Sequence, residues 1–191
     1  MKSPARDRAR RAMAATSREG FLPPDQVRWA DADRPLPIGE GQTNSQPTTV
    51  LDMLELLAPV QGDRVLDVGS GSGWTTGILA ELVGRAGTVL GVERRPRLVD
   101  FGSRRVRALN RPWATIRAAQ DGVLGAPDCA PFDRILVSAQ GTELPQSLID
   151  QLGDEGVLVA PVAGRLVRVS ATAGGAHIER FGRYNFVPLV P

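Results

Sequence analysis

The sequence predicts an α/β fold: a mainly parallel sheet with helices on both faces and an antiparallel hairpin at its end. Two observations support this prediction. Between residues 64 and 152, short apolar runs typical of buried strands alternate with amphipathic runs of helical period, the pattern of a parallel sheet with crossover helices. After residue 156, strand-like runs follow one another without a helix and turn around residues 173–175, which indicates a closing hairpin.

The chain in front of the sheet has two parts. Residues 4–16 carry four arginines among alanines, which suits a short, solvated helix. Residues 20–41 are dense in proline and glycine and show no periodic pattern. A segment of this length is usually a functional loop, and here it can fold over a site as a lid.

A helix is expected next, from Pro47 at its first position to Ala58, with Ser45 or Gln46 near its cap. Thr43 and Ser45 admit two interpretations. Their hydroxyls either cap this helix or, together with its N-terminal amides, face an anionic substrate. The spacing alone favours capping.

The central stretch is residues 64–73, Arg-Val-Leu-Asp-Val-Gly-Ser-Gly-Ser-Gly. Its apolar part, residues 65–68, reads as a buried strand, and the glycines form the exit turn before a helix at Thr75–Val83. A strand, a glycine-rich turn and a helix N-terminus make a site for one nucleotide. The glycines let the backbone approach the ligand, and the free N–H groups of the first helical turn face it.

The glycine spacing indicates which nucleotide. A dinucleotide site has the pattern G-x-G-x-x-G. Here Gly69, Gly71 and Gly73 form G-x-G-x-G directly after an acid, Asp67. S-adenosylmethionine has no phosphate but carries an ammonium group and a sulfonium, and an acid suits these charges better than it suits a pyrophosphate. NAD(P) binding and a degenerate site are the alternatives.

Two more acids follow the next strands. The strand at Thr88–Val92 ends in Glu93, where a carboxylate can accept both ribose hydroxyls. Asp121 and Gly122 come after a strand-like run at Ala114–Ala118, where an acid can take the adenine amino group. An ordered set of glycine turn, Glu93 and Asp121 is more specific than the turn alone.

The remaining elements complete the alternation. They are a helix at Pro96–Leu109, a buried strand at Phe132–Val137, a short helix at Pro145–Leu152, a strand at Gly156–Val162, and a hairpin of Arg165–Ala171 with His177–Val187. Strands and helices that alternate in this way predict an open parallel sheet.

Composition bounds the partners. The chain has 191 residues, 42% of them hydrophobic, enough for one core and too few for two ordinary domains. Its 23 basic and 21 acidic residues give a net charge of +2, which favours neither nucleic acid nor an anionic membrane. No apolar run is long enough to span a bilayer. One cysteine, Cys129, and one histidine, His177, cannot form a metal cluster, and the single cysteine fits a cytoplasmic protein. We expect a monomer without a metal.

These residues resemble the protein-L-isoaspartate O-methyltransferases, and the resemblance extends from Ala12 to Leu189. The most specific motif is Pro-Leu-Pro-Ile-Gly-Glu-Gly-Gln-Thr-Asn-Ser-Gln-Pro at residues 35–47. Arg-Glu-Gly-Phe-Leu-Pro at 18–23, Val-Leu-Asp-Val-Gly-Ser-Gly-Ser-Gly-Trp at 65–74 and Phe-Val-Pro-Leu at 186–189 add to it.

The resemblance implies a Rossmann-like class I fold that binds S-adenosylmethionine, releases S-adenosylhomocysteine, and methylates the free carboxylate of isoaspartyl residues in proteins or peptides. Ser45 matches the hydroxyl beside the accepting carboxylate, with Thr43 in the same loop. On the acceptor side it also implies Asp33, Ile38, Gln42 and Asn44. The residues it assigns to the cofactor are Asp67, Gly69, Ser70, Gly71, Gly73, Glu93, Asp121 and Gly122. One domain would then hold an N-terminal helix and substrate lid at 1–46 and a cofactor-binding core at 47–191.

Two departures from the family pattern lie in the presumed substrate loop. Asn44 stands where the family usually has an apolar residue, and Asp31 replaces an aromatic residue, while Asp33 is kept. A diverged substrate loop with intact cofactor residues leaves other functions open. One is methylation of a normal aspartate in a dedicated partner peptide to form an aspartimide. Another is a protein that binds S-adenosylmethionine without turnover. Methylation of small molecules or nucleic acids is weaker, because the sequence has no base-methylation motif and no basic groove.

Overall fold

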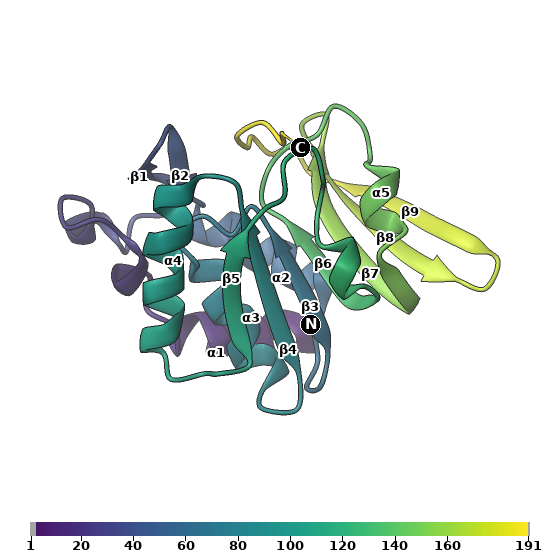
Figure 1. Cartoon of the computed structure of the whole chain (residues 1–191), viewed down its shortest axis with the longest axis horizontal. Helices are drawn as coiled ribbons and strands as arrows, with labels where there is room; N and C mark the ends of the chain where they lie inside the picture. The colour runs from purple at the N-terminus through teal and green to yellow at the C-terminus, as the bar shows by residue number, and fades with distance from the viewer. Residues whose placement is uncertain (1–2, 191) are drawn as a thin grey trace.

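A seven-stranded sheet forms the centre of the computed structural model, which describes residues 3–190 (Figure 1). Across the sheet the strands are β5 (Ala114–Ala118), β4 (Thr88–Glu93), β3 (Arg64–Val68), β6 (Phe132–Val137), β7 (Leu152–Val162), β8 (Arg165–Thr172) and β9 (Gly175–Phe181). The five strands from β5 to β7 are parallel, and β8 and β9 pair antiparallel to their neighbours. The prediction of a mainly parallel sheet with a terminal antiparallel hairpin is confirmed.

One face of the sheet is covered by three helices, α2 (Pro47–Leu57), α3 (Trp74–Val83) and α4 (Pro96–Ala108). Their apolar side chains share one core with the sheet residues Val65, Val89 and Leu136. A fourth helix, α1 (Pro4–Ala14), packs against α2 and α3 on their outer side (Figure 1).

The opposite face has a thinner cover. The 3-10 turn η3 (Pro127–Cys129), the one-turn helix α5 (Gln146–Ile149) and the loops around them pack on this side, where Leu148 and Ala126 enter a second apolar cluster. The helix expected at 145–152 is therefore too long. Leu152 already belongs to β7, which begins four residues before the expected Gly156.

The N-terminal helix is less solvated than its arginines suggest. Ala9 and Ala12 are buried in the main core, and the helix ends at Ala14. The guanidinium of Arg6 pairs with the carboxylates of Asp52 and Glu55 on α2. The helix is therefore solvated on one face only. Arg10 and Arg11 are exposed, while small alanine side chains on the other face let α1 approach α2 and α3 closely.

The loop at 20–41 contains short regular elements. They are η1 (Arg18–Phe21), η2 (Val27–Trp29) and the strand β1 (Leu36–Gly39), which pairs with β2 (Gln42–Asn44) in a small hairpin. Figure 1 shows this hairpin above the end of α4, at the edge of the sheet where the parallel strands end. Within residues 3–190, no helix combines the length and apolar character needed to cross a membrane.

The last segment corrects the expected hairpin. β9 ends at Phe181 rather than Val187, and Gly182 takes a φ of +40°, which turns the chain out of the sheet. Residues 187–190, here called the C-terminal strap, then return to the sheet. The Gln140 N–H donates to the Val187 carbonyl at 2.7 Å, and the Leu189 N–H donates to the Gln140 carbonyl at 2.8 Å.

Candidate functional site

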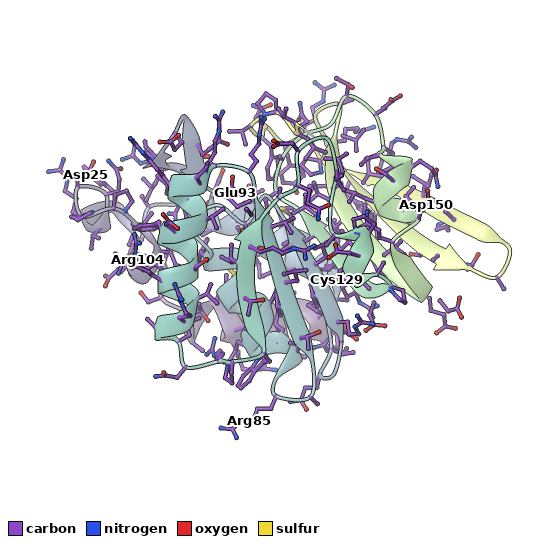
Figure 2. All side chains as sticks on the ribbon, viewed as in Figure 1. Asp25, Arg85, Glu93, Arg104, Cys129 and Asp150 are labelled. Carbon is purple, nitrogen blue, oxygen red and sulfur yellow. The ribbon has the colours of Figure 1, made fainter. Side chains whose placement is uncertain are left out.

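A cavity of about 240 Å³ opens at the carboxyl ends of β3, β4, β5 and β6. The chain runs from β3 outward to β4 and β5, then returns to the other side of β3 as β6. Open parallel sheets bind ligands at this reversal, because the loops leaving the two central strands diverge there. Figure 2 shows Glu93 at this edge of the sheet and Arg85 at the opposite end of the molecule.

The first four residues of the glycine turn (residues 69–73) form the floor of the cavity. The N–H groups of Gly69 and Ser70 donate to the Val92 carbonyl at 2.9 and 3.1 Å, which fixes the turn to β4. Gly69 and Gly71 have φ values of +77° and +53°, a region that favours glycine. A side chain at Gly71 would also place its Cβ 3.2 Å from Ile38.

The third glycine has a packing role. A Cβ on Gly73 would lie 2.9 Å from Val106 and 3.0 Å from Ile116, side chains on α4 and β5. Gly73 is also the N-cap of α3 with φ +88° and lies outside the residues that line the cavity. The structure therefore gives Gly73 a packing role, because its missing side chain lets α3 and α4 come together.

Asp67 lies beneath the turn, fully buried, and also does not line the cavity. Its Oδ2 accepts hydrogen bonds from the hydroxyls of Thr75 and Thr76, each at 2.7 Å. Its Oδ1 has no hydrogen-bond partner within residues 3–190. Burial, helped by the nearby charge of Glu93, raises the pKa of Asp67 to about 6.

Glu93 closes the turn from the β4 side. Its Oε2 accepts the Gly71 N–H at 3.0 Å, and its Oε1 accepts the Arg95 N–H at 2.8 Å. Each carboxylate oxygen keeps a lone pair for a further donor. Asp121 lines the same cavity. Gly122 lies outside it, and its φ of +73° serves the turn that leaves β5.

The opposite wall comes from the hairpin. Ile38 and the segment 42–45, which includes Gln42, Thr43, Asn44 and Ser45, line the cavity. Of the expected lid at 20–41, Ile38 is the residue that reaches it. Residues predicted for a donor and for an acceptor therefore meet in one cavity.

Asp33 lies outside the cavity and caps α2. Its carboxylate accepts the Thr48 N–H at 2.8 Å, the Thr48 hydroxyl at 2.7 Å and the Gln46 amide at 3.0 Å. These hydrogen bonds lower the pKa of Asp33. The spacing had favoured capping of α2 by the hydroxyls of Thr43 or Ser45, and this expectation was wrong. Gln46 is the N-cap by position, and the capping oxygens come from a residue thirteen positions earlier.

Arg18 is a structural centre that the sequence interpretation missed. The side chain is buried, and its guanidinium donates to the main-chain carbonyls of Ala30, Ala32, Arg34, Asn44 and Ser45. Burial lowers its pKa to about 10, so it remains a cation at neutral pH. The partners of Arg18 are main-chain carbonyls of an irregular segment, so the identities of the side chains there do not reveal these bonds. The one sequence signal for Arg18 was its place in the Arg-Glu-Gly-Phe motif.

The third wall was also missed. The C-terminal strap lines the cavity together with Ser138 and Ala139 after β6 and Trp74 at the start of α3. The motif Phe-Val-Pro-Leu at 186–189 marked this stretch, but the expected strand placed it in the hairpin. Within residues 3–190, no group of three His, Cys, Asp or Glu side chains is arranged to hold a metal.

Comparison with known proteins identifies the family. The sequence model of the family "Protein-L-isoaspartate(D-aspartate) O-methyltransferase (PCMT)" matches residues 2–191. The protein-L-isoaspartate O-methyltransferase of Methanospirillum hungatei is 41% identical over 191 residues, covering 96% of this chain and 85% of the relative. That of Methanopyrus kandleri is 41% identical over 189 residues, covering 96% and 84%.

Solved structures agree on the fold. A structure of a protein-L-isoaspartate O-methyltransferase superposes with a TM-score of 0.87 at 23% identity over 97% of this chain, which spans 62% of that protein. A putative enzyme of this kind from Plasmodium falciparum, solved with S-adenosyl-L-homocysteine, gives a TM-score of 0.81 at 24% identity over 96% of this chain and 90% of its own. The fold is that of the class I methyltransferases. The chain belongs to the protein-L-isoaspartate(D-aspartate) O-methyltransferase family.

Proposed function

We propose that this protein transfers a methyl group from S-adenosylmethionine to the free carboxylate of L-isoaspartyl residues in proteins or peptides. Family membership supports the reaction. One structural observation carries the site: a single cavity is lined by the glycine turn and Glu93 on one side and by Ser45 on the other. The comparisons do not favour the aspartimide or non-catalytic alternatives.

The donor side fits a nucleoside with charged methionine groups. The Ser70 hydroxyl is buried next to the cavity without a hydrogen-bond partner within residues 3–190, so a polar ligand atom would satisfy it. Gly69 and Gly71 allow close backbone approach. In this proposal Glu93 accepts the ribose hydroxyls and Asp121 the adenine amino group, while buried Asp67 contributes negative charge beneath the turn.

The acceptor side needs little chemistry of its own. S-adenosylmethionine supplies an electrophilic methyl group, and a carboxylate is already deprotonated at pH 7, so no strong general base is required. The protein must align the carboxylate with the methyl group and exclude water, and such positioning can contribute roughly 7–11 kcal/mol. Ser45 would orient the carboxylate through its hydroxyl, with Thr43 beside it. The resulting methyl ester loses methanol when the following backbone nitrogen attacks, which gives a succinimide.

A labelling experiment tests this function. Purified protein is incubated with methyl-labelled S-adenosylmethionine and two matched peptides, one isoaspartyl and one aspartyl. We expect base-labile label on the isoaspartyl peptide alone. Ser45→Ala should lower kcat/KM by roughly tenfold or more, because the carboxylate loses an orienting hydrogen bond.

Ser147→Ala is the matched control. Ser147 is exposed on α5, away from the residues that line the cavity, and its loss should leave the rate unchanged. Label on neither peptide would refute the proposal. Label on the aspartyl peptide alone would move the assignment to aspartimide formation.

A further inference from the structure

A buried polar bridge joins the two sides of the cavity. The Arg18 Nε–H donates to the Asn44 Oδ1 at 2.7 Å, and the Asn44 Nδ2 donates to the Ser72 Oγ at 3.1 Å. Arg18, Asn44 and Ser72 are 5%, 4% and 3% exposed. Since an arginine can only donate, the Asn44 oxygen must face Arg18 and its amino group must face Ser72. Asn44 therefore links the segment 42–45 to the glycine turn in one defined orientation.

Arg18 strengthens the same link at both ends. Its Nη2 donates to the carbonyls of Asn44 at 3.1 Å and Ser45 at 2.9 Å, which fixes the backbone of the segment that carries the Ser45 hydroxyl. Its guanidinium also lies over the ring of Trp74, 5.4 Å from the centroid. Trp74 follows the glycine turn directly and lines the cavity. One cation thus contacts both the segment 42–45 and the start of α3.

We propose that Asn44 is a positioning residue that couples donor binding to acceptor binding. Through its side chain, a ligand seated on the glycine turn restrains Ser72, and Ser72 restrains the segment that holds Ser45. This inference rests on the proposed function, since it names how the two substrates of that reaction affect one another. Asn44 and Ser72 both line the cavity described above.

The coupling follows from shared ordering. A ligand that rigidifies the glycine turn also rigidifies the segment 42–45 through the bridge. The segment then loses less conformational entropy when the peptide binds, so the peptide binds more tightly. The effect is reciprocal, because the peptide must favour donor binding by the same factor. The bridge is buried, where an unpaired amide or hydroxyl is costly, so the turn and the segment move together rather than separate.

Three substitutions separate the bridge from the fold. Asn44→Leu keeps a side chain of similar size but removes both hydrogen bonds. Asn44→Asp keeps the acceptor for Arg18 and offers a second oxygen to Ser72, whose hydroxyl can turn to donate. Ser72→Ala removes the other end. Ser170→Ala is the control. It deletes a buried hydroxyl on β8, outside the cavity, that has no hydrogen-bond partner in the described part of the chain, residues 3–190.

The first measurement is the affinity of an isoaspartyl peptide without and with saturating S-adenosylhomocysteine, which cannot react. In the wild type and in Ser170→Ala, S-adenosylhomocysteine should tighten peptide binding by roughly fivefold or more. In Asn44→Leu and Ser72→Ala the ratio of the two peptide affinities, with and without S-adenosylhomocysteine, should fall to about one. The double variant should show the same ratio as each single variant. Asn44→Asp should restore the ratio.

A structural role alone gives a different result. If Asn44 only held the loop folded, Asn44→Leu would weaken the peptide equally with and without the product, the ratio would stay at its wild-type value, and the inference would be wrong.

The second measurement needs no peptide. Amide hydrogen exchange of residues 42–45 should slow when S-adenosylhomocysteine binds the wild type, and should not respond in Asn44→Leu. Equal slowing in both proteins, or none in the wild type, would overturn the coupling. Failure of the proposed function can be told apart from failure of this inference. If the protein shows this exchange response but methylates neither peptide, the coupling through Asn44 stands and the proposed methylation is wrong.

Discussion

Asp67 is a carboxylate whose burial has a measurable cost. Its pKa is raised to about 6 in the folded protein, whereas an unfolded chain gives about 3.9. Between these values the folded state binds more protons than the unfolded state. The contribution of Asp67 to the free energy of unfolding therefore falls as pH rises from about 4 to about 6, and is constant above pH 6.

Asp67→Asn should remove this dependence. We expect the variant to gain stability over the wild type progressively from pH 4 to pH 6, by at most about 3 kcal/mol, because no buried charge forms. Thermal unfolding of the ligand-free protein at several pH values measures the difference. Asp154→Asn, which changes an exposed carboxylate, should follow the wild-type profile. Parallel profiles for Asp67→Asn and wild type would contradict the assignment.

At the scale of elements, α2 shows how a helix end is held from a distance. Asp33 supplies the oxygens that the first turn needs, and hydrogen bonding lowers its pKa. A carboxylate whose folded pKa is lowered stabilises the protein at neutral pH, and this contribution is lost as pH falls through that pKa.

Asp33→Ala should lower the free energy of unfolding at pH 7 by about 1 kcal/mol, the usual cost of a lost N-cap. Asp33→Asn should retain most of the stability, because its amide oxygen can still accept the Thr48 N–H. Denaturant unfolding measures both. Asp31→Ala changes a neighbouring exposed acid and serves as control. Equal loss in Asp31→Ala would show that local charge, rather than the cap, matters.

Elements differ in how much of them the sequence could predict. β3, α3, β4 and β6 were placed nearly to the residue, because their burial follows a regular period. The cap of α2, the bonds of Arg18 and the end of β9 could not be predicted. Each depends on main-chain groups or on residues distant in the chain, which no local pattern records. The residues of the glycine turn were found, but the packing role of Gly73 became visible only with α4 in place.

At the scale of the molecule, the cavity is assembled from both ends of the chain. The hairpin of β1 and β2 supplies one wall and the C-terminal strap another, around strand ends from the middle of the sequence. The strap is held by two main-chain bonds to Gln140, and Leu189 donates one of them.

Leu189→Pro should release the strap, because proline has no N–H to donate. We expect a loss of roughly tenfold or more in kcat/KM for the isoaspartyl peptide, since the carboxylate is then less well positioned and shielded. Leu189→Ala shortens the side chain but keeps the hydrogen bond, and should lose clearly less activity. Steady-state kinetics compare the two, and equal losses would refute the anchoring role.

The bonds of Arg18 have an evolutionary consequence. Three of its carbonyl partners, on Ala30, Ala32 and Arg34, belong to the irregular segment before the hairpin. A carbonyl is present whichever side chain the residue carries. Replacement of the exposed Arg34, or of the exposed Asp31 in the same segment, therefore leaves these bonds available. The exposed side chains of residues 30–34 can therefore accumulate substitutions while one buried arginine preserves the path of the chain.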